Sequence, residues 1–416
     1  MTNPQSGNDV CIIIGASHGG VNLAFALRKE GWSGDIHVID KDPNPPYHRP
    51  PLSKAHLLSD AGLEKILLKS LKAYEDNGIK LHLGHTVTAI DHHQQLVNFE
   101  DGSSQHYDKL VLAVGARPII PPIKGIDSVK HLFPMRTAEH VNQIRSAFAQ
   151  SDSKHVVIIG GGYIGLETAA SLQKMGAKVT VLEREERILA RVTAPVMSEF
   201  FHRLHADNNV KIHTEKNVVE LRQTADTQEV VCSDGSIYPA NLIVMGVGIR
   251  VNQELAEEAG LEIDNGIKVD ASCRTSDVNI YAIGDCTYHH NKHYDRFLRL
   301  ESVQNAVDQA KTTAKALTGK EADYDALPWF WSDQYDVKLQ MVGLSQGYNN
   351  IIKRDESENG QHKFSTWYFK DDELLAVDAV NNAKAYVVGT KFIADKKQPK
   401  KADVSNTNVD LKDLLR

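Results

Sequence analysis

Two glycine-rich hexapeptides have the residue types and spacing that bind the phosphates of a nucleotide. The second, GGGYIG at residues 160–165, fits the pattern GxGxxG in full. In this pattern Gly160 allows a tight turn, Gly162 lets the backbone approach a pyrophosphate, and Gly165 lets helix and strand pack closely. The N-terminus of the following helix then faces the phosphates. The hexapeptide, with Tyr163 and Ile164 inside it, is therefore predicted to bind a dinucleotide.

The first hexapeptide, GASHGG at residues 15–20, departs from the pattern at one position. Ser17 stands where the second glycine is expected. Serine is small, so close approach of a phosphate remains possible, and its hydroxyl offers an additional donor. Gly15, Gly19 and Gly20 complete the predicted turn, and a second dinucleotide site is expected here.

An acidic residue follows each hexapeptide at the distance expected for a ribose ligand. Glu183 comes 18 residues after Gly165, and Asp40 comes 20 residues after Gly20. A carboxylate at this place accepts hydrogen bonds from ribose hydroxyls and repels a 2′-phosphate. The second site is therefore predicted to prefer NADH over NADPH, although Arg184 and Arg187 lie nearby. Lys41 adjoins Asp40 and is a second candidate for contact at the first site.

The elements around these turns repeat along the chain. An apolar strand is expected at residues 10–14, a helix after the first turn, and a second strand at 35–40. The same strand, turn, helix and strand recur from residue 154 to residue 183. Gly15 and Gly160 are 145 residues apart, too far for a solenoid repeat and suited to two separate domains. Two nucleotide-binding domains in one chain indicate electron transfer between flavin and nicotinamide.

The rest of the chain supports a larger α/β architecture. Strands ending in glycine are expected within 109–125, 240–250 and 279–286, and a helix over 300–317. From about Glu321 the sequence turns to aromatic, alternating segments typical of antiparallel strands, and it ends in a polar, loose tail with a short helix. The predicted fold class is α/β, with two Rossmann-like dinucleotide-binding domains and a smaller α+β C-terminal domain. The expected boundaries are 1–117 with 249–320 for FAD, 118–248 for NAD, and 321–416 for the C-terminal domain.

Composition excludes several classes of function. The 416 residues carry a formal net charge of −7, which gives no reason to expect nucleic-acid binding. The four cysteines form no CxxC pair, so a metal site and a dithiol centre are not expected, and the thiols are typical of a cytoplasmic protein. The N-terminal decapeptide lacks the features of a signal peptide, and no apolar run is long enough to cross a membrane.

Seven motifs together resemble one known family. The chain is similar to the FAD-dependent ferredoxin reductases of the putidaredoxin reductase type, which serve bacterial oxygenases. The motifs that carry this resemblance are YHRPPLSK at 47–54, LVLAVGARP at 110–118, GGGYIGLE at 160–167, VMGVG at 244–248, YAIGDC at 281–286, ESVQNAVDQA at 301–310 and PWFWSDQY at 328–335. The resemblance covers nearly the whole chain, and it implies that the two Rossmann-like domains are of the pyridine nucleotide-disulfide oxidoreductase-like type.

The resemblance implies roles for particular residues. Lys54 resembles the lysine near the flavin N5 edge that is ion-paired with a glutamate, here Glu167; an ordinary surface pair is the alternative. Asp285 matches the ligand of the ribitol chain, and the backbone amide of Val303 matches the donor to the flavin pyrimidine carbonyl. The family's acid for the first nucleotide aligns with Lys41 rather than Asp40. Further positions implied in FAD binding are Arg49, Val87, Gly115, Arg117, Arg136 and Gly284. The strand end beside the nicotinamide is represented by Gly246, Val247 and Gly248.

The implied activity has two halves. NADH passes a hydride to FAD, and the electrons then leave one at a time to a two-iron–two-sulfur ferredoxin serving a monooxygenase or dioxygenase. The absence of a redox cysteine pair in the sequence favours such an external acceptor over a disulfide reductase activity. Rubredoxin as acceptor, and a slow apoptosis-inducing-factor-like flavoprotein, are the alternatives. The protein is expected to be a monomer or weak dimer.

A ferredoxin is usually acidic, so a basic docking patch is expected despite the net charge. Residues 288–299 contain Lys292, Arg296 and Arg299 against Asp295, a balance of 3 − 1 = +2. This segment directly follows the predicted flavin-contacting Asp285. It is predicted to dock the partner. Trp331 is considered for partner contact or for shielding of the flavin.

Overall fold

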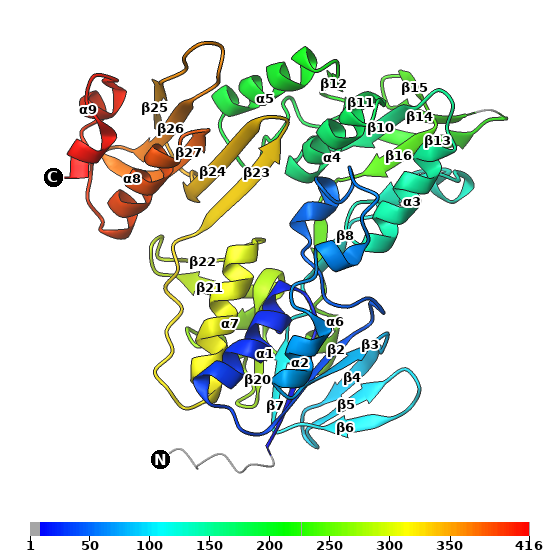
Figure 1. Cartoon of the computed structure of the whole chain (residues 1–416), viewed down its shortest axis with the longest axis vertical. Helices are drawn as coiled ribbons and strands as arrows, with labels where there is room; N and C mark the ends of the chain where they lie inside the picture. Colours follow the sequence, from blue (N-terminus) through cyan, green and yellow to red (C-terminus); the bar gives the residue numbers. More distant parts are fainter. Residues whose placement is uncertain (1–8, 226, 416) are drawn as a thin grey trace. The chain divides into compact units, whose positions relative to one another are not determined.

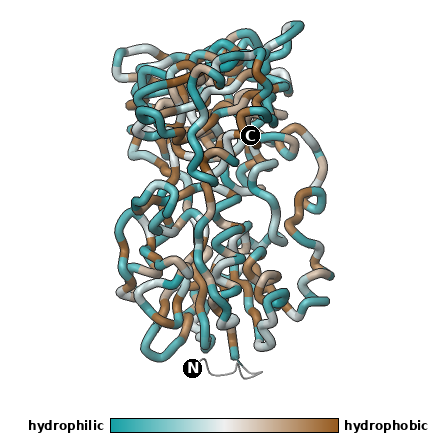
Figure 2. The backbone as a smooth tube through the Cα atoms, turned by 90° about the vertical axis from the view of Figure 1, so that its left-hand side faces the viewer, coloured by the Kyte–Doolittle hydropathy of each residue, from teal (hydrophilic) through white to brown (hydrophobic). Residues whose placement is uncertain are grey.

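The computed structural model describes residues 9–225 and 227–415, and the expectation for the N-terminal decapeptide falls largely outside them. The chain forms two compact units, and each contains more than one segment. The first unit contains residues up to 48, 63–117 and 251–330, and the second contains residues 49–62, 118–250 and 331 onward. Figure 1 shows the elements of both. Figure 2 shows hydrophobic and hydrophilic stretches alternating along the backbone.

The first unit is built on a parallel sheet in the order β20-β7-β1-β2-β3. Its strands are β1 (Val10–Ile14), β2 (Asp35–Asp40), β3 (Ile79–Leu83), β7 (Lys109–Leu112) and β20 (Ile280–Ala282). Helices α1 (His18–Glu30) and α7 (Val303–Leu317) lie side by side in Figure 1 and pack together. The predicted strands at 10–14 and 35–40 are confirmed. The expected helix at 300–317 begins three residues later, because Ser302 is its N-cap and accepts a hydrogen bond from Asn305 N.

Smaller elements complete the first unit. An antiparallel sheet and a mixed sheet accompany the central one. Their strands are β4 (Val87–Asp91), β5 (Leu96–Phe99) and β6 (Ser104–His106), then β18 (Ile263–Asp264), β19 (Gly266–Val269), β21 (Thr287–Asn291) and β22 (Arg296–Leu298). The helices are α2 (Leu71–Asp76) and α6 (Glu254–Glu258). The chain passes between the units within β8 (Ala116–Pro118), β17 (Ile249–Val251) and β23 (Trp329–Gln334).

The second unit repeats the parallel architecture, in the order β12-β11-β10-β16-β9. The strands are β9 (Leu132–Pro134), β10 (His155–Ile159), β11 (Lys178–Leu182), β12 (Lys211–His213) and β16 (Leu242–Met245). A separate antiparallel sheet has β13 (Val218–Gln223), β14 (Gln228–Cys232) and β15 (Ile237–Ala240). The helices are α3 (Ala138–Ala149), α4 (Tyr163–Lys174) and α5 (Pro195–Asp207). The second strand–turn–helix–strand repeat predicted from the sequence is thereby confirmed.

The C-terminal part of the second unit is an antiparallel sheet covered by a helix. The sheet order is β23-β24-β27-β26-β25. Besides β23, its elements are β24 (Val337–Gly343), β25 (Asn350–Asp355), β26 (Phe364–Lys370), β27 (Glu373–Val380) and helix α8 (Ala383–Ala394), followed by α9 (Lys401–Ser405). The expectation of antiparallel strands after residue 321 is confirmed.

The expectation of a loose tail is wrong for the described residues. Val404 and Leu411 are fully buried. The buried guanidinium of Arg354 donates hydrogen bonds to the carbonyl oxygens of Val404, Asn406 and two further tail residues. A buried cation needs several acceptors, and the tail carbonyls supply them. A polar composition therefore did not indicate a mobile segment here.

Candidate dinucleotide and redox sites

The first glycine-rich turn lies at the carboxyl edge of the parallel sheet. Ile14, Leu112 and Ala282 are adjacent in register, so the residues that follow these strands gather at one edge. This edge brings together Gly15, Gly115 and the 3₁₀ turn of Gly284 and Asp285. In open parallel sheets such an edge is the usual place for a ligand. The predicted flavin residues from three distant segments thus meet in space.

Backbone packing explains the glycines of the first turn. Gly15 has φ +109°, and a Cβ there would lie 2.2 Å from the carbonyl oxygen of Ala113. A Cβ on Gly20 would lie 1.9 Å from the carbonyl oxygen of Gly15. Gly19 has more room, since its nearest neighbour would be Ile283 at 3.4 Å. Ser17 is the N-cap of α1, and among the described residues its hydroxyl makes no capping hydrogen bond. The Ser17 hydroxyl is thus not used to cap α1, and its contact with a phosphate stays a prediction.

Asp40 holds the first turn through backbone contacts. Its Oδ2 accepts a hydrogen bond from Ala16 N at 2.6 Å, and its Oδ1 accepts one from Asp42 N at 2.8 Å. Lys41, the alternative candidate, is exposed. The structure therefore gives Asp40 a role in shaping the turn, which sequence spacing alone did not indicate.

The start of α7 lies against the turn that carries Asp285. A Cβ on Gly284 would be 3.4 Å from the Cβ of Ala306, in the first turn of α7. Gly284 N donates to Gln309 Oε1 at 2.7 Å, which fixes the turn to the helix. Val303 is the first residue of α7, so its N–H belongs to the positive end of the helix. The arrangement fits a flavin ring that carries negative charge when reduced.

Three predicted arginines differ in their surroundings. Arg117, in the first unit, donates to Asn252 Oδ1 at 2.7 Å and forms an ion pair of 2.5 Å with Glu254. Its guanidinium is thus already engaged by protein groups. In the second unit, Arg49 Nη1 donates to the carbonyl oxygen of Arg136 at 2.9 Å, so these two residues do lie together. Val87 begins β4 and is half-buried.

The second glycine-rich turn has nearly the same construction as the first. Gly160 has φ +110°, and a Cβ there would lie 2.3 Å from the carbonyl oxygen of Gly246. A Cβ on Gly165 would lie 2.2 Å from the carbonyl oxygen of Gly160. A Cβ on Gly162, by contrast, would meet no described atom within 4 Å. The open side of Gly162, at the start of α4, is where a pyrophosphate can approach the backbone.

The residues that follow β16 lie beside this turn. Ile159 and Met245 are partners in the register of β10 and β16, so Gly246, Val247 and Gly248 follow at the same sheet edge as Gly160. Gly248 has φ +117° and its carbonyl oxygen accepts from Ile119 N at 3.0 Å. The exposed fraction of the Ile164 side chain is 42%, while Tyr163 donates its hydroxyl to Met341 Sδ at 3.1 Å.

Glu183 holds the second turn as Asp40 holds the first. Its Oε2 accepts from Gly161 N at 2.6 Å, and its Oε1 accepts from Glu185 N at 2.9 Å. The nearby Arg187 is engaged within its own loop, where its guanidinium donates to the carbonyl oxygens of Thr193 and Ala190 and to Ser198 Oγ. A 2′-phosphate would therefore meet a carboxylate and not a free Arg187.

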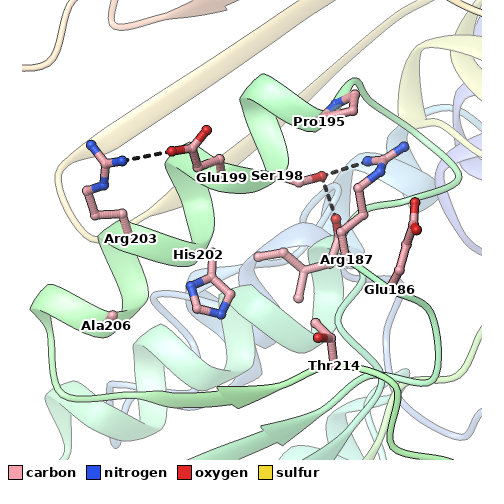
Figure 3. Close-up of a pocket in the computed structure, with 10 residues that line it drawn as sticks. Glu186, Arg187, Pro195, Ser198, Glu199, His202, Arg203, Ala206 and Thr214 are labelled. Atoms are coloured by element: carbon pink, nitrogen blue, oxygen red, sulfur yellow. Dashed lines mark hydrogen bonds and ion pairs between the residues drawn. The ribbon is translucent and has the colours of Figure 1, made fainter.

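A cavity of about 580 Å³ lies between the loop after β11 and helix α5 (Figure 3). Arg187 and Ser198 point toward each other on one side of it, and Glu199 forms an ion pair of 2.9 Å with Arg203 on the helix. His202 and Thr214 also line the cavity. Its charged groups are largely satisfied by one another, so the cavity adds no group with an evident chemical role.

Lys54 and Glu167 form the predicted ion pair, and it is not a surface pair. Lys54 Nζ lies 2.6 Å from Glu167 Oε2, and the exposed fraction of the Glu167 side chain is only 5%. Ser53 Oγ donates to the same carboxylate oxygen at 2.6 Å, and Lys54 Nζ also reaches the carbonyl oxygen of Pro50 at 3.3 Å. A buried carboxylate persists when it is paired and hydrogen-bonded, as this one is. The pair joins the 3₁₀ turn Pro50–Ser53 to α4.

The predicted docking segment lies on β21 and β22, and its cations are paired. Lys292 forms an ion pair with Asp323, and Arg299 forms one with Glu301. Arg296 lies over the ring of Tyr294, 5.8 Å from its centroid. Counting Asp295, Glu301, Asp323 and Asp325 against the three cations gives 3 − 4 = −1. The fold therefore places acidic residues beside a segment that is basic in sequence. Trp331 lies in β23 and is half-buried.

Comparison with known proteins places the chain in a family. The model of the pyridine nucleotide-disulphide oxidoreductases matches residues 9–310, and that of the reductase C-terminal domain matches residues 329–415. Putidaredoxin reductase CamA of Pseudomonas putida is 40% identical over 99% of this chain and 98% of its own. A ferredoxin–NAD(P)+ reductase of Sphingomonas sp. is 40% identical over 92% of each chain. The putidaredoxin reductase in its covalent complex with putidaredoxin aligns with a TM-score of 0.93 and 40% identity over 98% of both chains.

The chain thus belongs to the pyridine nucleotide-disulphide oxidoreductase family. Within it, the chain groups with the ferredoxin reductases of the putidaredoxin reductase type. The family, the fold class, the oxidoreductase activity and the cofactors FAD and NADH predicted from the sequence are confirmed. In the described ranges all four cysteines are buried and unbridged, and burial raises the pKa of Cys11, Cys273 and Cys286 to about 12.

The described residues contain neither a candidate metal cluster nor a helix suited to cross a membrane. Residues 9–225 and 227–415 contain no group of three or more His, Cys, Asp or Glu side chains suited to a metal ion. Over the same ranges, every helix is too short or too polar to cross a membrane.

Sequence reasoning missed the surroundings of Glu167. Ser332 Oγ donates to Glu167 Oε1 at 2.7 Å, and Gln334 and His205 lie behind it. These residues come from β23 and α5, far from the PPLSK and GGGYIGLE motifs in sequence. Ser332 and Gln334 belong to the PWFWSDQY motif, but the motif gives no sign of a contact with Glu167, because that contact joins distant segments.

Proposed function

We propose that this protein is an NADH-dependent reductase that passes electrons from bound FAD, one at a time, to a two-iron–two-sulfur ferredoxin serving a bacterial monooxygenase or dioxygenase. The observation that carries this proposal is the duplicated turn, one copy for each nucleotide, together with the buried Lys54–Glu167 pair. The putidaredoxin complex among the similar structures supports a ferredoxin as acceptor. NADH is the preferred donor, because Glu183 repels a 2′-phosphate and Arg187 is engaged in its loop.

The chain's own residues bind and orient the two nucleotides. When bound, FAD supplies the redox chemistry, because it accepts a hydride and releases electrons singly. The N-termini of α1 and α4 bind the two pyrophosphates, with the Ser17 hydroxyl as an additional donor at the first. The N-terminus of α7, with Val303, stabilises negative charge on the flavin pyrimidine. Lys54 is held in position by Glu167 and sets the charge near the flavin N5 edge. Orientation of the two rings, and not a dedicated base, is the main contribution to rate.

Several finer assignments belong to the same proposal. Asp285 binds the ribitol chain, and Arg49, Arg136 and Val87 contact the rest of FAD. The three-domain division at residues 117, 248 and 320, the cytoplasmic location and a monomer or weak dimer also remain parts of the proposal. Four buried, unbridged thiols are consistent with a reducing compartment.

The docking surface is proposed to be the segment 288–299. Trp331 is proposed separately, for partner contact or for shielding of the flavin. Lys292 is held in an exposed ion pair with Asp323, which contributes little and can exchange for a partner's carboxylate. The Arg299 side chain is only 16% exposed and pairs with Glu301. Phe297 adds an apolar centre, with 41% of its side chain exposed. Charge reversal at Arg296 and Arg299 should raise the apparent KM for ferredoxin and leave ferricyanide reduction unchanged. Unchanged ferredoxin kinetics would remove the docking assignment.

Rubredoxin is the second candidate acceptor. A rubredoxin–NAD(+) reductase of Pseudomonas putida is 34% identical over 90% of this chain. The deciding experiment is stopped-flow reduction of the FAD-loaded protein by NADH, followed by mixing with a candidate ferredoxin or a rubredoxin. Faster oxidation by ferredoxin supports the proposal, and faster oxidation by rubredoxin replaces it. An NADH:ferricyanide rate barely above background would favour the apoptosis-inducing-factor-like alternative.

A further inference from the structure

A buried chain of hydrogen bonds connects Glu167 to the C-terminal part of the second unit. Ser332 Oγ donates to Glu167 Oε1 at 2.7 Å, and Gln334 Nε2 lies 3.2 Å from Ser332 Oγ. His205 Nε2 lies 2.8 Å from Gln334 Oε1. Tyr335 OH lies 3.3 Å from His205 Nδ1. Ser332 and Gln334 have an exposed fraction of 1%, and His205 is fully buried.

The donors in this chain all point toward the carboxylate. A carboxylate has no hydrogen to donate, so Ser332 must donate its hydroxyl hydrogen to Glu167. The Ser332 oxygen then accepts from the Gln334 amide, whose carbonyl accepts from His205 Nε2–H. His205 is neutral, because burial lowers its pKa to about 4, and its Nδ1 can therefore accept from the Tyr335 hydroxyl. Every hydrogen bond strengthens the next, and the series ends on a buried negative charge.

Helix α4 is held along one stripe by the hairpin of β23 and β24. Tyr163 contacts Met341, Glu167 accepts from Ser332, and Lys174 Nζ reaches the carbonyl oxygen of Tyr335 at 3.3 Å. Positions 163, 167 and 174 lie on the same side of a helix. The hairpin is therefore aligned with the helix that carries Glu167, over nearly the whole length of that helix.

We propose that Ser332, supported by Gln334 and His205, is a positioning residue that acts on Lys54 through Glu167. The two carboxylate oxygens of Glu167 have different partners. Oε2 accepts hydrogen bonds from Lys54 and Ser53, and Oε1 accepts one from Ser332. Without the Ser332 bond the carboxylate can rotate, and the ammonium group then loses its fixed position. The C-terminal domain thus helps to set the charge presented to the flavin. This inference rests on the proposed function, since it assumes that Lys54 faces the flavin.

The test compares Ser332→Ala with Ser365→Ala. Ser365 is a fully buried serine in β26 that accepts from Trp367 Nε1 at 2.9 Å, so its substitution removes a comparable hydrogen bond away from Glu167. The midpoint potential of the bound flavin is measured by dithionite titration with an equilibrated dye, which does not require NADH. We expect Ser332→Ala to lower the potential and to slow flavin reduction by NADH about 10-fold, as the loss of a hydrogen bond to a charged group implies. Ser365→Ala should leave both quantities as in the wild type.

A second comparison isolates the route through Glu167. Ser332→Ala is also introduced into a Glu167→Gln background, with FAD content and thermal unfolding measured for every variant. The effect of Ser332→Ala on the potential should vanish there, because the residue acts through the carboxylate. An equal effect in both backgrounds, or no difference between Ser332→Ala and Ser365→Ala, would overturn the inference. Failure of NADH to reduce the wild-type flavin would instead count against the proposed function, and the dithionite titration would still decide the role of Ser332.

Discussion

The two glycine-rich turns differ far less in backbone than in sequence. In each, a glycine with φ near +110° lies against a carbonyl of a neighbouring strand end, and the last glycine lies against the first. In each, a carboxylate at the end of the second strand (Asp40) or directly after it (Glu183) accepts from the N–H of the residue that follows the first glycine. Ser17 stands where Gly162 stands, and a Cβ at Gly162 would be unobstructed. The first and last glycines of each turn are therefore required for packing. The position of Ser17 and Gly162 is instead open on the side from which a phosphate can approach.

The largest expected effect comes from the packing glycines. Gly15→Ala and Gly160→Ala would each place a Cβ within 2.3 Å of a carbonyl oxygen and impose a positive φ on alanine. Each is expected to destabilise its turn by about 3 kcal/mol or more. Gly15→Ala should abolish FAD retention, and Gly160→Ala should weaken NADH binding while FAD is retained. FAD absorbance after purification and NADH titration check this, and equal loss of both nucleotides in either variant would contradict the assignment of one turn to each.

The second-largest effect is expected in the C-terminal sheet, which supports helix α4. Helix α1 packs on α7, whereas α4 contacts the C-terminal sheet, in which Asp378 is buried beside Tyr368 and Thr193. Burial raises the pKa of Asp378 to about 6. Its folded pKa lies above the unfolded value, so the native state binds the proton more tightly, and stability falls as pH rises from about 4 to about 6.

Asp378→Asn should therefore stabilise the second unit above pH 6. The amide keeps an oxygen that can accept from Tyr368 and Thr193, but it carries no buried charge. We expect a gain of about 2 kcal/mol at pH 8 that declines below pH 6 and disappears near pH 4. Thermal unfolding of both proteins over this pH range is the measurement. A difference independent of pH would show that the carboxylate is not the cause.

A smaller effect is expected at the two acids. Glu183→Gln and Asp40→Asn each replace a charged acceptor of a backbone N–H by a neutral one, which costs about 1–2 kcal/mol. Glu183→Gln also removes the repulsion of a 2′-phosphate, so the ratio of kcat/KM for NADH over NADPH should fall about 10-fold. Asp40→Asn should weaken FAD binding without changing this ratio. If both variants changed the ratio equally, the acid of the second turn would not be the determinant.

How much of this could be read from the sequence depends on the range of the interaction. The strand at residues 10–14 and both turns involve local patterns, and they were predicted. The Lys54–Glu167 pair joins residues 113 apart, and it was implied only by the family resemblance. The paired state of Lys292 and Arg299 depends partly on residues that the fold brings in, such as Asp323. The buried tail depends on Arg354, and the support of Glu167 depends on Ser332. Such contacts join segments far apart in sequence, so charge and motif patterns did not indicate them.

The smallest effect is expected from exchanging the residues at the second glycine position, which are Ser17 in the first turn and Gly162 in the second. Gly162→Ser makes the second turn resemble the first, and Ser17→Gly does the reverse. A Cβ at Gly162 meets no described atom within 4 Å, and its φ of −80° suits any residue. Stability should therefore change by less than about 0.5 kcal/mol in Gly162→Ser. Because the added side chain faces the approach to the pyrophosphate, the Kd for NADH should rise only a few-fold, as measured by fluorescence titration. A loss of folding would mean that Gly162 is a packing glycine like Gly160, while a loss of NADH binding with folding intact would mean that the second turn needs a closer approach to its phosphates than Ser17 permits in the first.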